Sequence, residues 1–145
     1  MSNFNFRLER VLNYKGTVEE IKKAEYGDSQ RKLNFEEDKL HTYNRHKNSV
    51  KDEKNLSTSK TNAGNLAMYS DYISILDNKI KDQEEVVSSA RIELEEAKEE
   101  MIEAVQEKKA FEKLKEKEYE KHLYQIKRLE EKQTDTIVNY KISTQ

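Results

Sequence analysis

Residues 66–111, LAMYSDYISILDNKIKDQEEVVSSARIELEEAKEEMIEAVQEKKAF, decide the fold, because one set of their side chains recurs in alternating steps of three and four. Twelve of the fourteen positions in this set are apolar, and only Gln83 and Lys108 are not. Such a heptad repeat is typical of a long α-helix that packs against a partner helix with left-handed supercoiling. The fourteen positions are Leu66, Tyr69, Ile73, Leu76, Ile80, Gln83, Val87, Ala90, Leu94, Ala97, Met101, Ala104, Lys108 and Phe111.

The composition of the whole chain favours the same architecture. The 145 residues contain no proline, where about seven would be average, so only three glycines could interrupt a helix. Hydrophobic residues make up 34% and charged residues 39%, which is too little apolar surface for a globular core but enough for a narrow seam. The regular spacing argues against the disorder that so polar a chain otherwise favours. We therefore predict an all-α fold, a long antiparallel two-helix coiled-coil hairpin that forms one domain over residues 1–145.

A stretch rich in Ser, Thr, Asn and Gly, LSTSKTNAGN, marks the expected turn of the hairpin. We predict a first helix over about 4–56, the turn over about 57–64, and a longer second helix over about 65–140. Thr61 or Asn62 is the candidate N-cap of the second helix.

Gly27 is the weakest point of the predicted first helix. Glycine costs about 1 kcal/mol relative to alanine in a helix, and Asp28 and Ser29 follow it. We expect a kink or a loosely packed seam there, with a true break as the alternative.

The first helix has a poorer apolar stripe, which predicts the register of the hairpin. Its members are Phe4, Leu8, Val11, Val18, Ile21, Leu33, Leu40, Tyr43 and Val50. If the chain folds back near Thr61, the two stripes face each other residue by residue. The expected pairs are Ile21 with Met101, Val18 with Ala104, Val11 with Phe111, Leu33 with Ala90, Leu40 with Gln83, Tyr43 with Ile80, and Val50 with Ile73.

The same register makes the two helices unequal. Phe4 falls opposite Glu118, so the second helix projects past the first by about 20 residues, roughly 30 Å. An unpaired apolar stripe on one helix is unstable in water, so it requires a second copy, another protein or partial disorder. The apolar residues of this overhang are Tyr119, Leu123, Ile126, Leu129, Ile137, Val138 and Tyr140.

Charge is segregated along the second helix, although the formal net charge of the chain is only −2. Residues 93–107 hold seven acids and one base, and residues 108–128 hold eight bases and four acids. One interpretation is a solvated face with ion pairs four residues apart. The other is a basic collar that meets an acidic surface of a partner. The near-neutral total gives no general attraction to nucleic acid or to an anionic membrane.

The sequence offers no catalytic constellation. His41, His46 and His122 are scattered, cysteine is absent, and the glycines form no phosphate-binding loop. We expect no enzyme activity, no cofactor and no metal. No apolar run is long enough to span a membrane, and the N-terminus lacks the apolar stretch of a signal peptide, so we expect a cytoplasmic protein.

Three stretches resemble the flagellar FliJ family, in order and over nearly the whole chain. FNFRLERVLNYKGTVEEIKKAEY resembles the N-terminus of that family, AGNLAMYSDYISILDNKI the start of its second helix, and EKKAFEKLKEKEYEKH its basic region. The resemblance implies a component of the bacterial flagellar type III export apparatus. It implies an antiparallel coiled coil, similar to the stalk of a rotary ATPase, whose open end sits in the hexameric export ATPase and promotes its assembly or activity.

The resemblance also implies two further partners, the cytoplasmic domain of the membrane export gate on the hairpin side, and export chaperones. It implies a cytoplasmic protein at the inner face of the cell membrane, at the flagellar base. We expect it to be monomeric when free and to bind no nucleic acid.

Two sets of residues match the surfaces that the family uses. The gate-facing candidates are Leu40, Tyr43, Tyr72, Leu76, Lys79 and Gln83. Lys79 and Gln83 depart from the family pattern, and four of the six lie on the predicted seams, where packing between the helices is the alternative role. Tyr72 lies outside the seam. The candidates for the ATPase ring are Arg7, Arg10, Lys108, Lys109, Lys113, Lys115, Leu123, Ile126 and Leu129.

Two other classes of function stay open from the residues alone. A self-associating structural coiled coil or adaptor would pair its overhangs between copies and form dimers or larger species. An RNA-binding rod would bind any polyanion with a steep dependence on salt.

Overall fold

The chain forms two α-helices in the computed structural model, which describes residues 3–57 and 62–144. Helix α1 spans Glu9–Ser57 and helix α2 spans Ala63–Ser143, 49 and 81 residues respectively. No described residue lies in a strand. The prediction of an all-α hairpin with a longer second helix is therefore confirmed.

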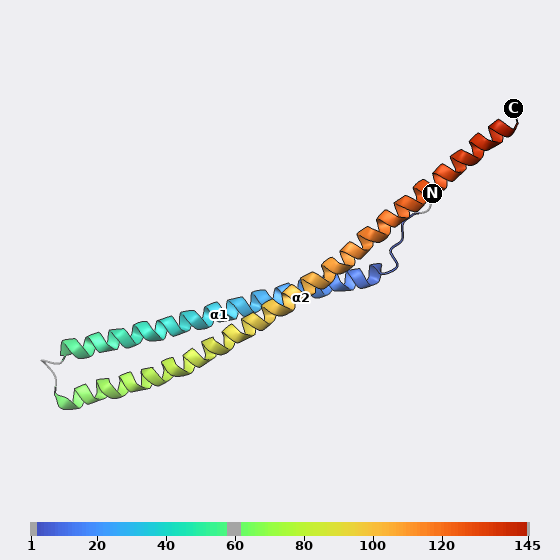
Figure 1. Cartoon of the computed structure of the whole chain (residues 1–145). Coiled ribbons are helices and arrows are strands. Elements are labelled where there is room, and N and C mark those ends of the chain that lie inside the picture. The colour runs from blue at the N-terminus through green and yellow to red at the C-terminus, as the bar shows by residue number, and fades with distance from the viewer. Residues whose placement is uncertain (1–2, 58–61, 145) are drawn as a thin grey trace. The chain divides into compact units, whose positions relative to one another are not determined.

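Contacts between residues divide the chain into two compact units. The hairpin unit is Lys22–Met101, and the end unit combines Met1–Ile21 with Ile102–Gln145. In the hairpin unit, the C-terminal part of α1 and the N-terminal part of α2 run antiparallel, side by side (Figure 1). In the end unit, the start of α1 lies beside a more C-terminal part of α2. That the chain forms one domain stays a prediction.

All fourteen heptad positions of α2 are buried or half-buried. Leu76, Val87 and Ala90 keep only 3%, 3% and 2% of their surface exposed. The seam of α2 is thus where the repeat places it, because apolar side chains three and four residues apart share one face of a helix.

Eight of the nine members of the expected stripe, Val11 and Val18 included, are buried or half-buried, and only Ile21 is exposed. The seam of α1 also takes in positions that the stripe omits. Ile21 was expected to face Met101 but is 51% exposed, whereas Leu12, which the stripe omits, is 9% exposed. The positions that turn inward form a heptad of their own, and about half of them are polar. They are Leu8, Leu12, Lys15, Glu19, Lys22, Tyr26, Ser29, Leu33, Glu36, Leu40, Tyr43, Lys47, Val50, Lys54 and Ser57, all buried or half-buried. Long polar side chains can line a seam because their alkyl stems pack while their charged ends reach a partner.

The register of the hairpin agrees with the prediction in both units. Leu33 packs with Val87 and Ala90 in one buried cluster of the hairpin unit. In the end unit the rings of Phe4 and Tyr119 meet edge to face, with centroids 5.2 Å apart, where Phe4 was expected opposite Glu118. These pairs are centred close to Thr61, the predicted turn.

The N-terminal segment is not helical, and α1 begins five residues later than expected. Phe6 is 4% exposed, and its carbonyl oxygen accepts a hydrogen bond of 3.2 Å from the Glu9 N–H at the start of α1. Phe4 is half-buried. Residues two apart lie on opposite sides of a helix, so a helix through this segment would not turn both phenylalanines inward.

The other ends of the helices follow local chemistry. Asn62 caps α2, because its Oδ1 accepts a hydrogen bond of 2.9 Å from the Asn65 N–H, three residues on. Thr61, the other candidate cap, lies outside the described residues. Gly27 does not break α1, which is continuous from Glu9 to Ser57.

Candidate docking surfaces

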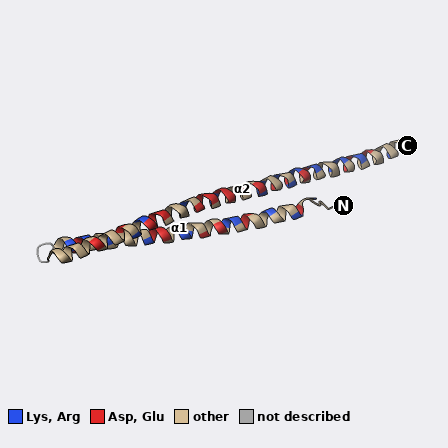
Figure 2. Cartoon of the chain, turned by 90° about the horizontal axis from the view of Figure 1, so that it is seen from below, with Lys and Arg blue, Asp and Glu red and all other residues tan. Residues whose placement is uncertain are grey.

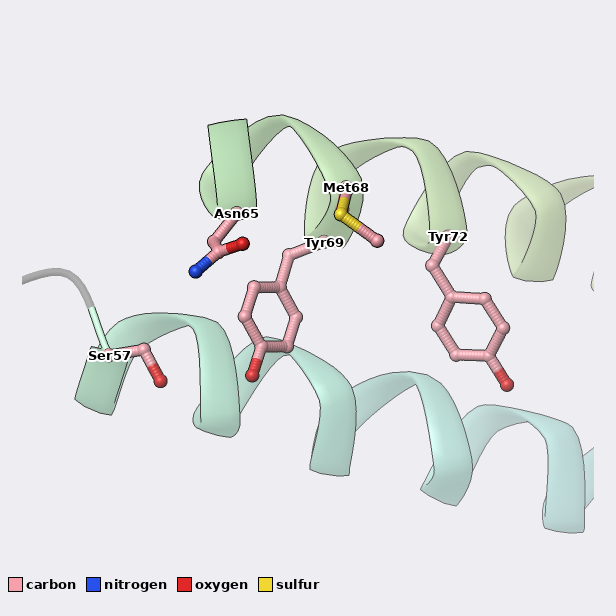
Figure 3. A pocket seen from close by; sticks show the side chains of 5 residues that line it. All are labelled: Ser57, Asn65, Met68, Tyr69 and Tyr72. Atoms are coloured by element: carbon pink, nitrogen blue, oxygen red, sulfur yellow. The ribbon is translucent and has the colours of Figure 1, made fainter. Parts of the chain in front are cut away.

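A cleft opens between the end of α1 and the start of α2 in the hairpin unit. It has a volume of about 440 Å³ and is lined by Ser57, Asn65, Met68, Tyr69 and Tyr72. In Figure 3 the rings of Tyr69 and Tyr72 extend from α2 toward α1. Aromatic and thioether walls with a few polar groups suit an apolar side chain of a partner protein.

Tyr72 is tied to α1 by His46. The Nε2 atom of His46 lies 2.8 Å from the hydroxyl oxygen of Tyr72, at hydrogen-bonding distance. The two rings also meet edge to face, with centroids 5.8 Å apart and an interplanar angle of 86°. Both residues are exposed, and Tyr72 keeps 43% of its surface accessible. Tyr72 therefore presents a surface whose orientation depends on the other helix.

The six gate-facing candidates divide into inward and outward residues. Leu76 and Gln83 are 3% and 5% exposed, so the seam occupies them and a partner could reach them only if the helices separated. The Gln83 amide donates to the backbone carbonyl of Glu36 at 3.0 Å, and also to its carboxylate. Leu40 and Tyr43 are half-buried in the opposite seam. Only Tyr72 and Lys79 are exposed.

A row of exposed residues on α2 extends this outward surface. Met68 is 70% exposed and Ile75 is 53% exposed, and with Tyr72 and Lys79 they are spaced by four, three and four residues. Residues with this spacing lie on one face of a helix. The sequence pattern alone did not single out Met68, Ile75 or His46 as surface residues of this site. The heptad could have revealed the first two, since they flank the seam by one residue.

In the end unit, α2 continues beyond the residues that pack against it. Ile126 is its last half-buried residue, and every described residue from Lys127 to Thr144 is exposed (Figure 1). This segment is the overhang from here on, and it begins later than the sequence predicted, because Tyr119 packs against Phe4 and Ile126 is half-buried. It carries five large apolar side chains with about half or more of their surface exposed. They are Leu129, Ile137, Val138, Tyr140 and Ile142, at 60%, 56%, 47%, 68% and 66%. Leu123, just before the overhang, is 47% exposed.

The basic collar before the overhang has two kinds of members. Lys115 pairs with Glu9 at 2.9 Å, and Lys108 lies 3.8 Å from both Glu19 and Glu112. These two lysines bind α1 to α2 within the end unit. The remaining ring candidates of positive charge, Arg7, Arg10, Lys109 and Lys113, are exposed. In Figure 2 basic residues recur along the C-terminal part of α2.

The acidic run of α2 pairs with α1 rather than only along its own helix. Lys15 binds Glu107 at 2.8 Å in the end unit, and Lys22 binds Glu100 at 3.0 Å in the hairpin unit. Figure 2 shows the acids gathered near the middle of α2. The hydrogen bond that Lys15 donates to Glu107 raises the pKa of Lys15 above its ordinary 10.5. Neither interpretation offered by the sequence included these cross-helix pairs.

The described residues hold no group of three or more side chains arranged to bind a metal ion. Among the same residues, neither helix has an apolar window of the length and hydropathy that crossing a membrane demands.

Comparison with known proteins identifies the family. The family model for the flagellar FliJ protein matches residues 4–145. The chain belongs to the FliJ family. Members of this family are non-enzymatic components of the flagellar type III export apparatus, and membership makes this chain an export component.

A solved structure shows the same fold. It is a putative YscO homolog from Chlamydia trachomatis, which superposes with a TM-score of 0.72 at 23% sequence identity, covering 93% of each chain. No curated protein matches the sequence. At this identity the likeness supports the two-helix fold, and the family match carries the assignment to flagellar export.

Proposed function

We propose that this FliJ-family protein is a non-enzymatic stalk that binds the hexameric flagellar export ATPase through its end unit. Binding would promote assembly or activity of the ring. The single observation that carries the proposal is the overhang, where every described residue from Lys127 to Thr144 is exposed although several are large and apolar. Such a surface is stabilised when another protein encloses it.

The charge of the end unit supports the same docking. Arg7, Arg10, Lys109 and Lys113 are exposed in the part of the end unit that precedes the overhang, and an acidic rim on the ring would complement them. Lys108 and Lys115 already pair within the unit, so we assign them a structural role first. Leu123, Ile126 and Leu129 continue as the apolar part of the docking surface.

The hairpin unit would link the stalk to the cytoplasmic domain of the membrane export gate. The outward row Met68, Tyr72, Ile75 and Lys79 and the adjoining cleft support this part of the proposal. Leu40 and Tyr43 would contribute only their exposed edges, and Leu76 and Gln83 would act by shaping the seam. Export chaperones are further proposed partners, and we propose a cytoplasmic location at the inner face of the membrane, at the flagellar base.

The test is binding and ATPase activity with the cognate ring. Leu129→Asp and Ile137→Asp place a charge on exposed apolar positions and should weaken ring binding at least about tenfold. Asn139→Asp adds the same charge at an exposed polar position on another side of the overhang helix and should change ring binding little. The proposal fails if the wild-type chain neither binds the ring nor alters ATP hydrolysis, or if all three variants bind like wild type.

Self-association is the second candidate, since a second copy would also cover the overhang. Sedimentation over a wide concentration range separates the two. A stalk that requires the ring stays monomeric alone, whereas a structural coiled coil forms dimers that Leu129→Asp dissociates.

A further inference from the structure

We propose that His46 is a positioning residue that holds the ring of Tyr72 ready to dock the export gate. This inference rests on the proposed gate-facing role of the hairpin unit. The partner is a segment of the gate's cytoplasmic domain that inserts an apolar side chain into the cleft beside Tyr72.

The geometry that carries the inference joins the two helices. Tyr72 belongs to α2 and forms one wall of the cleft, whereas His46 belongs to α1. The imidazole holds the Tyr72 ring in two ways, by the contact of 2.8 Å from Nε2 to the hydroxyl and by the edge-to-face packing of the rings. The Tyr72 side chain is thus held both at its hydroxyl and by ring packing, which leaves it little freedom to rotate over the cleft.

A role in stability alone accounts poorly for this pair. Both side chains are exposed, where a neutral hydrogen bond competes with water and adds little to folding. Docking differs, because a partner that meets an already ordered aromatic side chain does not have to immobilise it. The cross-helix contact therefore affects binding more than folding.

The experiment measures the affinity of the full chain for the purified cytoplasmic domain of the cognate export gate. His46→Ala and Tyr72→Phe each remove the hydrogen bond and should weaken binding about three- to tenfold, the range for ordering one side chain. The double variant should lose no more affinity than the single variant with the larger loss, because both changes remove one shared interaction. His46→Gln keeps a hydrogen-bonding group and should restore most of the affinity.

His41→Ala is the matched control, because it removes another exposed histidine of α1 that has no contact with Tyr72. The thermal unfolding midpoint of each variant should stay within the error of wild type. If a variant does unfold earlier, comparison of His46→Gln with His46→Ala at a temperature where both are folded still tests the inference.

Two failures are distinguishable. If Tyr72→Ala abolishes binding while His46→Ala binds like wild type, or if the losses of the single variants add in the double variant, His46 does not position Tyr72 and the gate-facing surface stands. If Tyr72→Ala binds like wild type, the gate-facing surface itself is wrong, and the inference about His46 is overturned with it.

Discussion

In the hairpin unit the apolar heptad of α2 packs against α1, whereas in the end unit α2 runs on through the overhang, where every described residue is exposed. Leu76, Val87 and Ala90 are almost fully buried in the first unit, but Leu129 and Tyr140 in the second are 60% and 68% exposed. One continuous helix thus carries a segment that packs on its own chain and a segment that we propose is covered by another protein. Apolar side chains at helical spacing build the fold in one unit and stay exposed in the other.

The largest expected effect is on two neighbouring valines of the hairpin unit. Val87 is 3% exposed, and Val86 is 41% exposed. Val87→Asp buries a charge without a partner and should destabilise the unit by roughly 3–5 kcal/mol. Val86→Asp should cost less than about 1 kcal/mol. Denaturant unfolding followed by circular dichroism measures both, and similar losses for the two variants would contradict the seam described here.

The next largest loss of stability is expected in the non-helical segment that precedes α1 in the end unit. Phe6 is 4% exposed, so Phe6→Ala should destabilise the unit by about 3 kcal/mol. Because the loss is local, we expect faster hydrogen exchange in the part of α2 near Tyr119, with little change near Val87. Tyr14→Ala, at a position 64% exposed, is the control and should leave exchange unchanged.

Gln83 tests how much a polar residue in the buried seam contributes to the stability of the hairpin unit. Gln83→Ala leaves a cavity and removes the donor to Glu36, and it should cost about 1–3 kcal/mol. Gln83→Leu restores an apolar heptad position, and because Glu36 is half-buried and reaches water, it should be neutral or stabilising. Thermal unfolding of the two variants measures the difference. Equal destabilisation by both would mean that the amide contributes more than the apolar contact.

Alkaline pH should have a smaller effect, exerted through the lysines that bind the acidic run. Lys15, Lys22 and Lys32 donate hydrogen bonds to Glu107, Glu100 and Glu93, and these bonds raise the pKa of each lysine above 10.5. Their contribution to stability is complete below pH 10.5 and is lost as the pH rises through the raised pKa values. Circular dichroism melts between pH 9 and pH 12 should show this loss. A variant with all three lysines changed to glutamine should lose less over the same range, and an equal loss would assign the effect to other groups.

The smallest expected effect lies in the overhang. Leu129→Ala and Ile137→Ala remove exposed side chains and should change the unfolding free energy by no more than about 0.5 kcal/mol. The control is Leu76→Ala in the hairpin unit, where about 2–5 kcal/mol is expected. A large loss of stability at Leu129 in a monomeric sample would mean that the overhang packs on something within the chain, and the contrast between the units would not hold.

The α2 seam could be predicted residue by residue, whereas the apolar stripe of the first helix predicted only part of the α1 seam. In α2 the apolar residues mark one face of the helix. The heptad also placed the polar Gln83 on that face, and Gln83 is buried there. In the first half of α1 the apolar residues alone do not mark the seam, and Ile21 is exposed while Lys22 is half-buried in the seam. Glu100 of α2 binds Lys22, so the partner helix rather than the local pattern determines which face of α1 turns inward.

The candidate docking surfaces were also predicted only in part from the sequence. The sequence identified Tyr72 as an outward residue and the overhang as an unpaired apolar segment. Leu76 and Gln83 also matched the family's surface, yet both are occupied by the seam. The contact between His46 and Tyr72 was not foreseen, although folding the chain near Thr61 brings the two residues within about one helical turn of each other.

By itself the sequence determined the helical fold, the place of the turn, the register and the unequal lengths of the helices. These follow from short-range periodicity and from the absence of proline, both of which act along a single chain. Three features followed only from the tertiary structure. They are the packing of Phe6, the polar half of the α1 seam and the contact of His46 with Tyr72. Each of these depends on which atoms of a distant segment lie opposite, and that is fixed only when the two helices pack.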